Sequence, residues 1–228
     1  RIIYYDYTMF KMWEYVHTRR YESDSMVKAR YEFREWIMAD FDNILKTINS
    51  NIDKEMNLFN IELMTILKSV EKAVAVEAVK FYDEPLEFEY QVQKILRDAG
   101  YFSLVSNFIN ESYDKNYTEI IALFESVGLN ATFSEVDLTS INAIKALDLE
   151  FFDDIGKQAS SKLKRDLYKY SLSDMTKVTM VDNIKESLAD TDLVKYSSTY
   201  ADTAISNFNQ SLIDIKSEDV TGEVYIYR

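Results

Sequence analysis

The chain is 228 residues long, which is enough for one large domain or two small ones with a substantial hydrophobic core. Hydrophobic residues make up 47% of it and aromatic residues 14%, which excludes a disordered acidic tail. The sequence has no cysteine, which excludes disulfide scaffolds, thiolate zinc sites and cysteine nucleophiles, and its formal charge of −13 disfavours direct binding to nucleic acid.

Turn-forming residues are scarce, because the whole chain holds four glycines and one proline. A fold rich in β-sheet needs many tight turns, so this composition favours long helices with few connections. We therefore predict an all-α fold, an elongated bundle of long helices and helical hairpins. No apolar run approaches the roughly 18 residues that a membrane span requires.

Residues 1–22 are predicted to form an aromatic N-terminal arm. Tyrosine, tryptophan and methionine are enriched at protein interfaces, and this segment is crowded with them. We expect it to contact a partner protein rather than to fill a core. The residues predicted for this interface are Tyr4, Tyr5, Tyr7, Phe10 and Trp13.

Residues 23–221 are predicted to form the helical domain, which begins with a long rod or hairpin that runs to Pro85. Apolar residues in its second half alternate in steps of four and three, which is typical of an apolar seam on a helix. The predicted seam consists of Ile52, Met56, Phe59, Leu63, Ile66, Val70 and Ala73. The polar stretch at 49–51 leaves open whether the rod is one helix or two.

Glycines divide the middle of the chain. A helix over about 86–98 is predicted to end at Gly100, and a second helix, with a possible break near 113–117, is predicted to end at Gly128. Two further helices are expected to meet near Gly156. After them, Ser173 is predicted to cap a short helix whose inward residues are Val178, Val181, Ile184 and Leu188.

The last predicted helix starts at Asp192 and carries a second apolar seam with seven-residue spacing. The members of this seam are Val194, Ala201, Ile205, Phe208, Leu212 and Ile215. After Gly222 the pattern changes to that of a β-strand, and residues 222–228 are interpreted as the first strand of a truncated C-terminal domain. Its exposed apolar residues are predicted to join the partner interface, namely Val224, Tyr225, Ile226 and Tyr227.

No catalytic, cofactor-binding or metal-binding residues are predicted. His17 is the single histidine, and a lone histidine beside aromatic residues is usually structural. Asp153 and Asp154 are interpreted as the polar start of a helix, and the basic stretch 162–170 as a solvated helix face that pairs with neighbouring acids. We therefore predict that the chain is not an enzyme and needs no cofactor.

Residues 166–228 carry a resemblance to a known family. Three elements are involved: Ser173, Asp174 and Met175 followed by Ile184; then Thr203 and Ala204 followed by Phe208 and Leu212; and finally Tyr225 and Tyr227 in the predicted strand. This order resembles the head morphogenesis, or minor capsid, proteins of tailed bacteriophages. The family's further D..TR..C motif lies beyond the last residue of this chain.

The resemblance implies a structural role in phage head assembly. The expected location is the virion, near the portal vertex, with the portal and other capsid proteins as partners and an oligomeric state within a large assembly. Two alternatives stay open. The first is a helical pore-forming toxin that inserts residues 73–81, although Glu77 and Lys80 make this segment a poor membrane span. The second is a coiled-coil adaptor that dimerises through the 52–73 seam.

Overall fold

The computed structural model describes residues 24–126, 132–173 and 175–226, with side chains described for most residues between 43 and 216. The described part is all helical, as predicted, and contains no strand. Its helices are α2 (Asp24–Lys80), α3 (Phe88–Asp98), α4 (Tyr101–Ser126), α5 (Glu135–Ser171), α6 (Lys177–Ala189) and α7 (Asp192–Ile226).

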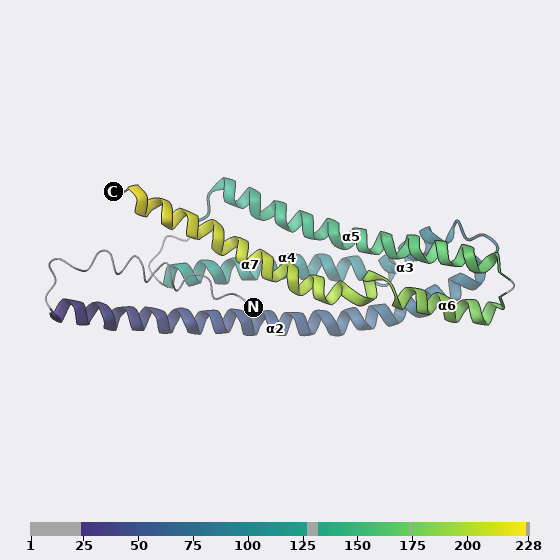
Figure 1. Ribbon diagram of the computed structural model, residues 1–228, viewed down its shortest axis with the longest axis horizontal. Coiled ribbons are helices and arrows are strands. Elements are labelled where there is room, and N and C mark those ends of the chain that lie inside the picture. The colour runs from purple at the N-terminus through teal and green to yellow at the C-terminus, as the bar shows by residue number, and fades with distance from the viewer. Residues whose placement is uncertain (1–23, 127–131, 174, 227–228) are drawn as a thin grey trace.

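The helices form four antiparallel rods (Figure 1). The first rod is α2 and the third is α5, whereas the second is α3 followed by α4 and the fourth is α6 followed by α7. The second and fourth rods touch through α4 and α7, but α2 and α5 make no substantial contact with each other. The outer faces of α2 and α5 therefore lie at opposite edges of the bundle.

The polar stretch at 49–51 does not interrupt α2, which is one continuous helix. Its buried positions advance in repeated steps of four, four and three, through Ile48, Ile52, Met56, Phe59, Leu63, Leu67, Val70, Val74 and Ala78. This eleven-residue repeat averages 3.67 residues per turn, close to a relaxed α-helix. Beyond Leu63, Val70 of the predicted seam is buried as predicted, whereas Ile66 and Ala73 are half-buried and Leu67 and Val74 occupy the buried positions.

The second and fourth rods each bend at one short junction. Gly100 has φ of +89°, and its N–H donates to the carbonyl of Arg97, so it ends α3 in the left-handed conformation that glycine favours. This confirms the predicted end of that helix. In the fourth rod, the buried Thr191 donates its hydroxyl to the carbonyl of Leu188 and starts α7.

Two predicted interruptions are absent from the described helices. α4 runs without a break through residues 113–117. α5 is one helix with Gly156 buried in its interior, so the predicted junction there was wrong. The physical reason is packing, because a Cβ at Gly156 would lie 3.1 Å from the ring of Phe102. Glycine therefore serves the close approach of α4 to α5 rather than a turn.

The start of α6 lies later than predicted. Thr176, not Ser173, is the N-cap, and its hydroxyl accepts a hydrogen bond from the backbone N–H of Thr179. The buried face consequently includes Met180, while Val178 points into solvent and Val181 is half-buried. Ile184 and Leu188 are buried as predicted.

The C-terminal strand prediction was also wrong for the described residues, because α7 continues through Ile226. A single strand without a partner leaves its backbone groups unpaired, whereas a continuing helix satisfies them within the chain. The seam of α7 was predicted more accurately. Ala201, Ile205, Phe208 and Leu212 are buried, and Val194 and Ile215 are half-buried.

Candidate functional site

The aromatic residues predicted to contact a partner lie outside the residues whose side chains the structure describes. Residues 1–23, including His17 and the predicted arm, lie outside the described residues. For 224–226 only the helical backbone is described, and Tyr227 lies outside the described part. The candidate sites described by the structure all lie on the helical bundle.

The family-motif residues do not form a common site in the described structure. Ser173 lies in the turn after α5, where its hydroxyl donates to the carbonyl of Tyr170. Met175 accepts a hydrogen bond from the side chain of Asn183, and Ile184 is buried in α6. Thr203 is exposed on α7, the helix that follows α6. Asp174 lies outside the described residues.

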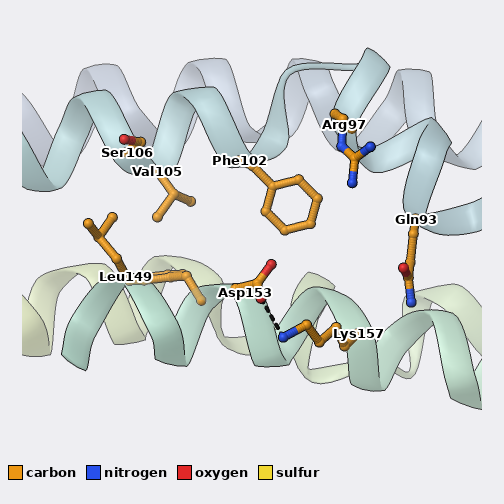
Figure 2. Close-up of a pocket in the computed structure, with 9 residues that line it drawn as sticks. Gln93, Arg97, Phe102, Val105, Ser106, Leu149, Asp153 and Lys157 are labelled. Carbon is orange, nitrogen blue, oxygen red and sulfur yellow. Dashed lines mark ion pairs between the residues drawn. The ribbon is translucent and has the colours of Figure 1, made fainter. Parts of the chain in front are cut away.

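One groove opens between the second and third rods (Figure 2). It has a volume of about 540 Å³, and its floor is apolar. Residues from α3, α4 and α5 point toward one another across it. They are Gln93, Arg97, Phe102, Val105, Ser106, Leu149, Phe152, Asp153 and Lys157.

Charged side chains surround the apolar floor of this groove. Lys157 pairs with Asp153 at 2.5 Å and with Asp154 at 3.3 Å. The hydrogen bond that Lys157 donates to Asp153 is the main cause that raises the pKa of Lys157. The two aspartates thus lie in mid-helix, so the prediction that they start a helix was wrong. Arg97 makes no ion pair with another described residue. The groove can accommodate an apolar group next to an anion or amide.

The titratable groups buried deeper in the bundle are held by hydrogen bonds. Tyr113 donates its hydroxyl to Asp148, and burial is the main cause that raises the pKa of both groups. Burial also raises the pKa of Tyr101 to about 12. No group of three acidic or histidine side chains among the described residues is placed to hold a metal ion.

The basic stretch 162–170 pairs with acids, as predicted. Lys164 binds Glu89 on α3, and together with Ser161 it lowers the pKa of that carboxyl. Lys162 lies 3.7 Å from Asp166 and 3.4 Å from Asp190. These contacts tie α5 to α3 and to the end of α6, which gives the cluster a role within the bundle.

The outer face of α2 presents an exposed apolar and basic ridge, which we call the α2 ridge. Its positions recur every three or four residues and contain three lysines but no acidic residue. Leu58 and Ile61 are 62% and 64% exposed, and Val76 is 56% exposed. The α2 ridge consists of Lys54, Leu58, Ile61, Thr65, Lys68, Lys72, Val76 and Val79.

A second exposed apolar surface lies across α5 and α7, and we call it the aromatic face. Phe151 on α5 meets Tyr200 on α7 edge to face at 4.8 Å, and Tyr196 lies 6.0 Å from Tyr200. Leu147 extends this surface along α5 and is 64% exposed. Glu150 and Asp154 lie within one turn of Phe151 on α5, and Asp154 pairs with Lys157.

Comparison with known proteins gives no match, whether with protein-family models, curated proteins or solved structures. The resemblance to phage minor capsid proteins therefore depends on residues 166–228 alone. None of the described helices combines the length and the apolar character of a membrane span. The 52–73 seam packs against other helices of the same chain, which leaves the adaptor hypothesis without that surface.

Sequence reasoning missed both exposed faces. The signal for the α2 ridge was present, because its positions follow the spacing of a helix face and lack acids in a chain with 39 acidic residues. The apolar seam on the opposite side of the same helix is larger and gives the stronger periodic signal. The aromatic face joins residues about 50 positions apart, so only the fold reveals it.

Proposed function

We propose that this chain is a structural protein that acts through protein–protein contacts within a larger assembly. The observation that supports this most is the pair of exposed apolar faces, one on α2 and one on α5 with α7. Side chains of Leu or Ile that are more than 60% exposed contribute nothing to the core of their own chain. Exposed apolar side chains that gather on one face of a protein typically mark an interface.

The assembly we propose is the head of a tailed bacteriophage, where the chain would be a minor capsid protein at the portal vertex. The resemblance of residues 166–228 to that family supports this assignment. The acidic character of the chain agrees with it as well, because a surface with a formal charge of −13 favours protein partners over packaged DNA. The partners in this proposal are the portal and other capsid proteins.

Binding to purified portal protein of the same virus tests the proposal. We expect the chain to bind immobilised portal rings saturably in biolayer interferometry, and to be found in purified heads by mass spectrometry. The variant Leu86→Glu adds a charge at a residue that is 77% exposed and lies outside both faces. It should bind portal rings as the wild type does, which controls for a general effect of an added surface charge. A folded chain that ignores portal rings and is missing from purified heads would refute the assignment to a phage head.

A further inference from the structure

The groove between the second and third rods contains side-chain donors without a partner in the described part of the chain. Arg97 makes neither an ion pair nor a side-chain hydrogen bond with another described residue, and the side-chain amide of Gln93 makes no hydrogen bond there either. The two residues are four positions apart on α3, so they share one face of that helix, and both extend toward α5 across the groove (Figure 2). One end of the groove therefore presents a cation and an amide to a molecule that enters it.

The other charges of the groove are compensated within the chain. Asp153 pairs with Lys157 at 2.5 Å, and Lys157 also pairs with Asp154, which does not line the groove. Asp98 follows Arg97 directly in α3 but makes no ion pair with it, because successive residues of a helix point in different directions. Among the described residues that line the groove, Arg97 is thus the charged side chain without a partner. A ligand that complements it carries a negative charge.

The floor of the groove is apolar. Val105 and Phe152 are 3% and 1% exposed, and Phe102 and Leu149 are half-buried beside them. The ring of Phe102 can lie close to α5 because Gly156 has no Cβ. An apolar group that covers this floor removes both its own surface and that of the floor from water, which is favourable. The ligand that fits the groove therefore has an apolar body as well as a negative charge.

The dimensions of the groove favour a small molecule. Its lining residues on α5 run from Leu149 to Lys157, which is about 12 Å of helix at 1.5 Å per residue. Its volume of about 540 Å³ lies within the range of small-ligand sites, roughly 300–1,000 Å³. A peptide would also bring backbone N–H and C=O groups, for which an apolar floor has few partners. A free acid brings only its carboxylate, which a guanidinium binds with two parallel hydrogen bonds.

We infer that this groove binds a free apolar monocarboxylic acid, with the carboxylate on Arg97 and the apolar body over Val105 and Phe152. The amide of Gln93 can donate a further hydrogen bond to the same carboxylate. A single carboxylate is expected because Asp153 lies in the same groove and would repel a second negative charge. The groove shares no lining residue with the α2 ridge or the aromatic face, so the inference goes beyond the proposed structural function and does not depend on it.

Binding of 4-phenylbutyrate, an aromatic ring with a short acid arm, tests the inference. NMR titration of this probe with the full chain should show saturable binding with a Kd of about 1 mM or below, as expected for a ligand of this size. Two analogues separate its parts: 4-phenyl-1-butanol lacks the carboxylate, and butyrate lacks the ring. Each analogue should bind at least about fivefold more weakly than 4-phenylbutyrate.

Arg97→Gln tests the position of the carboxylate, with Arg165→Gln as the matched control. Arg165 is also an exposed arginine without an ion pair to another described residue, but it lies on α5 outside the groove. The two substitutions change the net charge equally, and circular dichroism verifies that both variants are folded. We expect Arg97→Gln to weaken 4-phenylbutyrate about five- to tenfold and to leave 4-phenyl-1-butanol unchanged, so that the preference for the acid disappears. Arg165→Gln should bind both probes as the wild type does.

Four results of these titrations would overturn the inference: no saturable binding of 4-phenylbutyrate up to about 10 mM, equal binding of the acid and the alcohol, an Arg97→Gln variant that keeps the preference for the acid, or an Arg165→Gln variant that loses it. A further titration with N-acetyl-leucylphenylalanine tests the choice between a free acid and a peptide, because this dipeptide also carries one carboxylate beside apolar side chains. We expect it to bind more weakly than 4-phenylbutyrate, and tighter binding would overturn the assignment to a free acid.

Discussion

Replacement of Phe208 by alanine is predicted to destabilise the bundle strongly. The Phe208 side chain is only 1% exposed, and its ring stacks on Tyr113 with centroids 3.8 Å apart and planes 16° from parallel. This stack lies between α7 and α4, the helices through which the fourth and second rods pack against each other. It therefore combines a large buried side chain with a specific aromatic contact.

The expected magnitude follows from these two contributions. Truncation of a buried phenylalanine to alanine lowers the free energy of unfolding by about 3–5 kcal/mol, which includes the cavity that remains. The stacked pair accounts for about 0.5–1.5 kcal/mol of that loss. Phe208→Leu keeps most of the buried volume and removes the stack, so we expect it to lose roughly 1–1.5 kcal/mol.

Urea unfolding followed by circular dichroism at 222 nm measures both losses. If the free energy of unfolding falls with urea at the same slope in the variants and the wild type, all of them expose the same amount of surface on unfolding. Phe151→Ala is the matched control, because Phe151 is an α5 aromatic residue that is 45% exposed, and its loss should be clearly smaller. A Phe208→Ala variant that unfolds within about 1 kcal/mol of the wild type would refute the assignment of Phe208 to the core.

Three further changes probe separate features. In urea melts, Asp148→Asn should stabilise the chain more at pH 7 than at pH 3. The pKa of Asp148 is raised in the folded chain, so the wild type loses stability as the pH rises through that pKa, whereas asparagine does not titrate and still accepts the hydrogen bond from Tyr113. An equal gain in the free energy of unfolding at both pH values would contradict this. Gly156→Val should lower the free energy of unfolding by about 1–3 kcal/mol, because even its Cβ would lie 3.1 Å from the ring of Phe102, and an unchanged midpoint would show that the ring yields freely. Ser134→Ala removes the N-cap of α5 and should lower the free energy of unfolding by about 1 kcal/mol. Thermal melts measure this loss, with a Ser→Ala change in an exposed loop as the control. An unchanged free energy of unfolding would argue against the capping box.

The fold class and the main buried stripes were predictable from the sequence. Long segments with few glycines have no plausible alternative to helix, and the α7 seam from Ala201 to Leu212 is buried as its spacing indicates. The α2 seam was predicted with the wrong period. Steps of four and three fit both repeats over a short stretch, and only the burial of Leu67 and Val74 distinguishes the eleven-residue repeat.

The remaining errors share a physical origin in tertiary packing. Gly156 signals a helix end in isolation, but in the bundle it admits the ring of Phe102. Arg97 on α3 and Lys157 on α5 line the same groove (Figure 2). In the aromatic face, the ring of Phe151 on α5 contacts that of Tyr200 on α7. Contacts between residues so distant in the chain leave no local pattern, so they require the fold to be known.

Portal binding by variants of the two exposed faces offers the most direct test of the claim that these faces serve protein–protein contacts. Leu58→Glu with Ile61→Glu changes the α2 ridge, and Leu147→Glu with Tyr196→Glu changes the aromatic face, all at exposed side chains. The account predicts that at least one of these folded variants binds immobilised portal rings much more weakly than the wild type and Leu86→Glu do. Equal binding by all four chains would contradict the account.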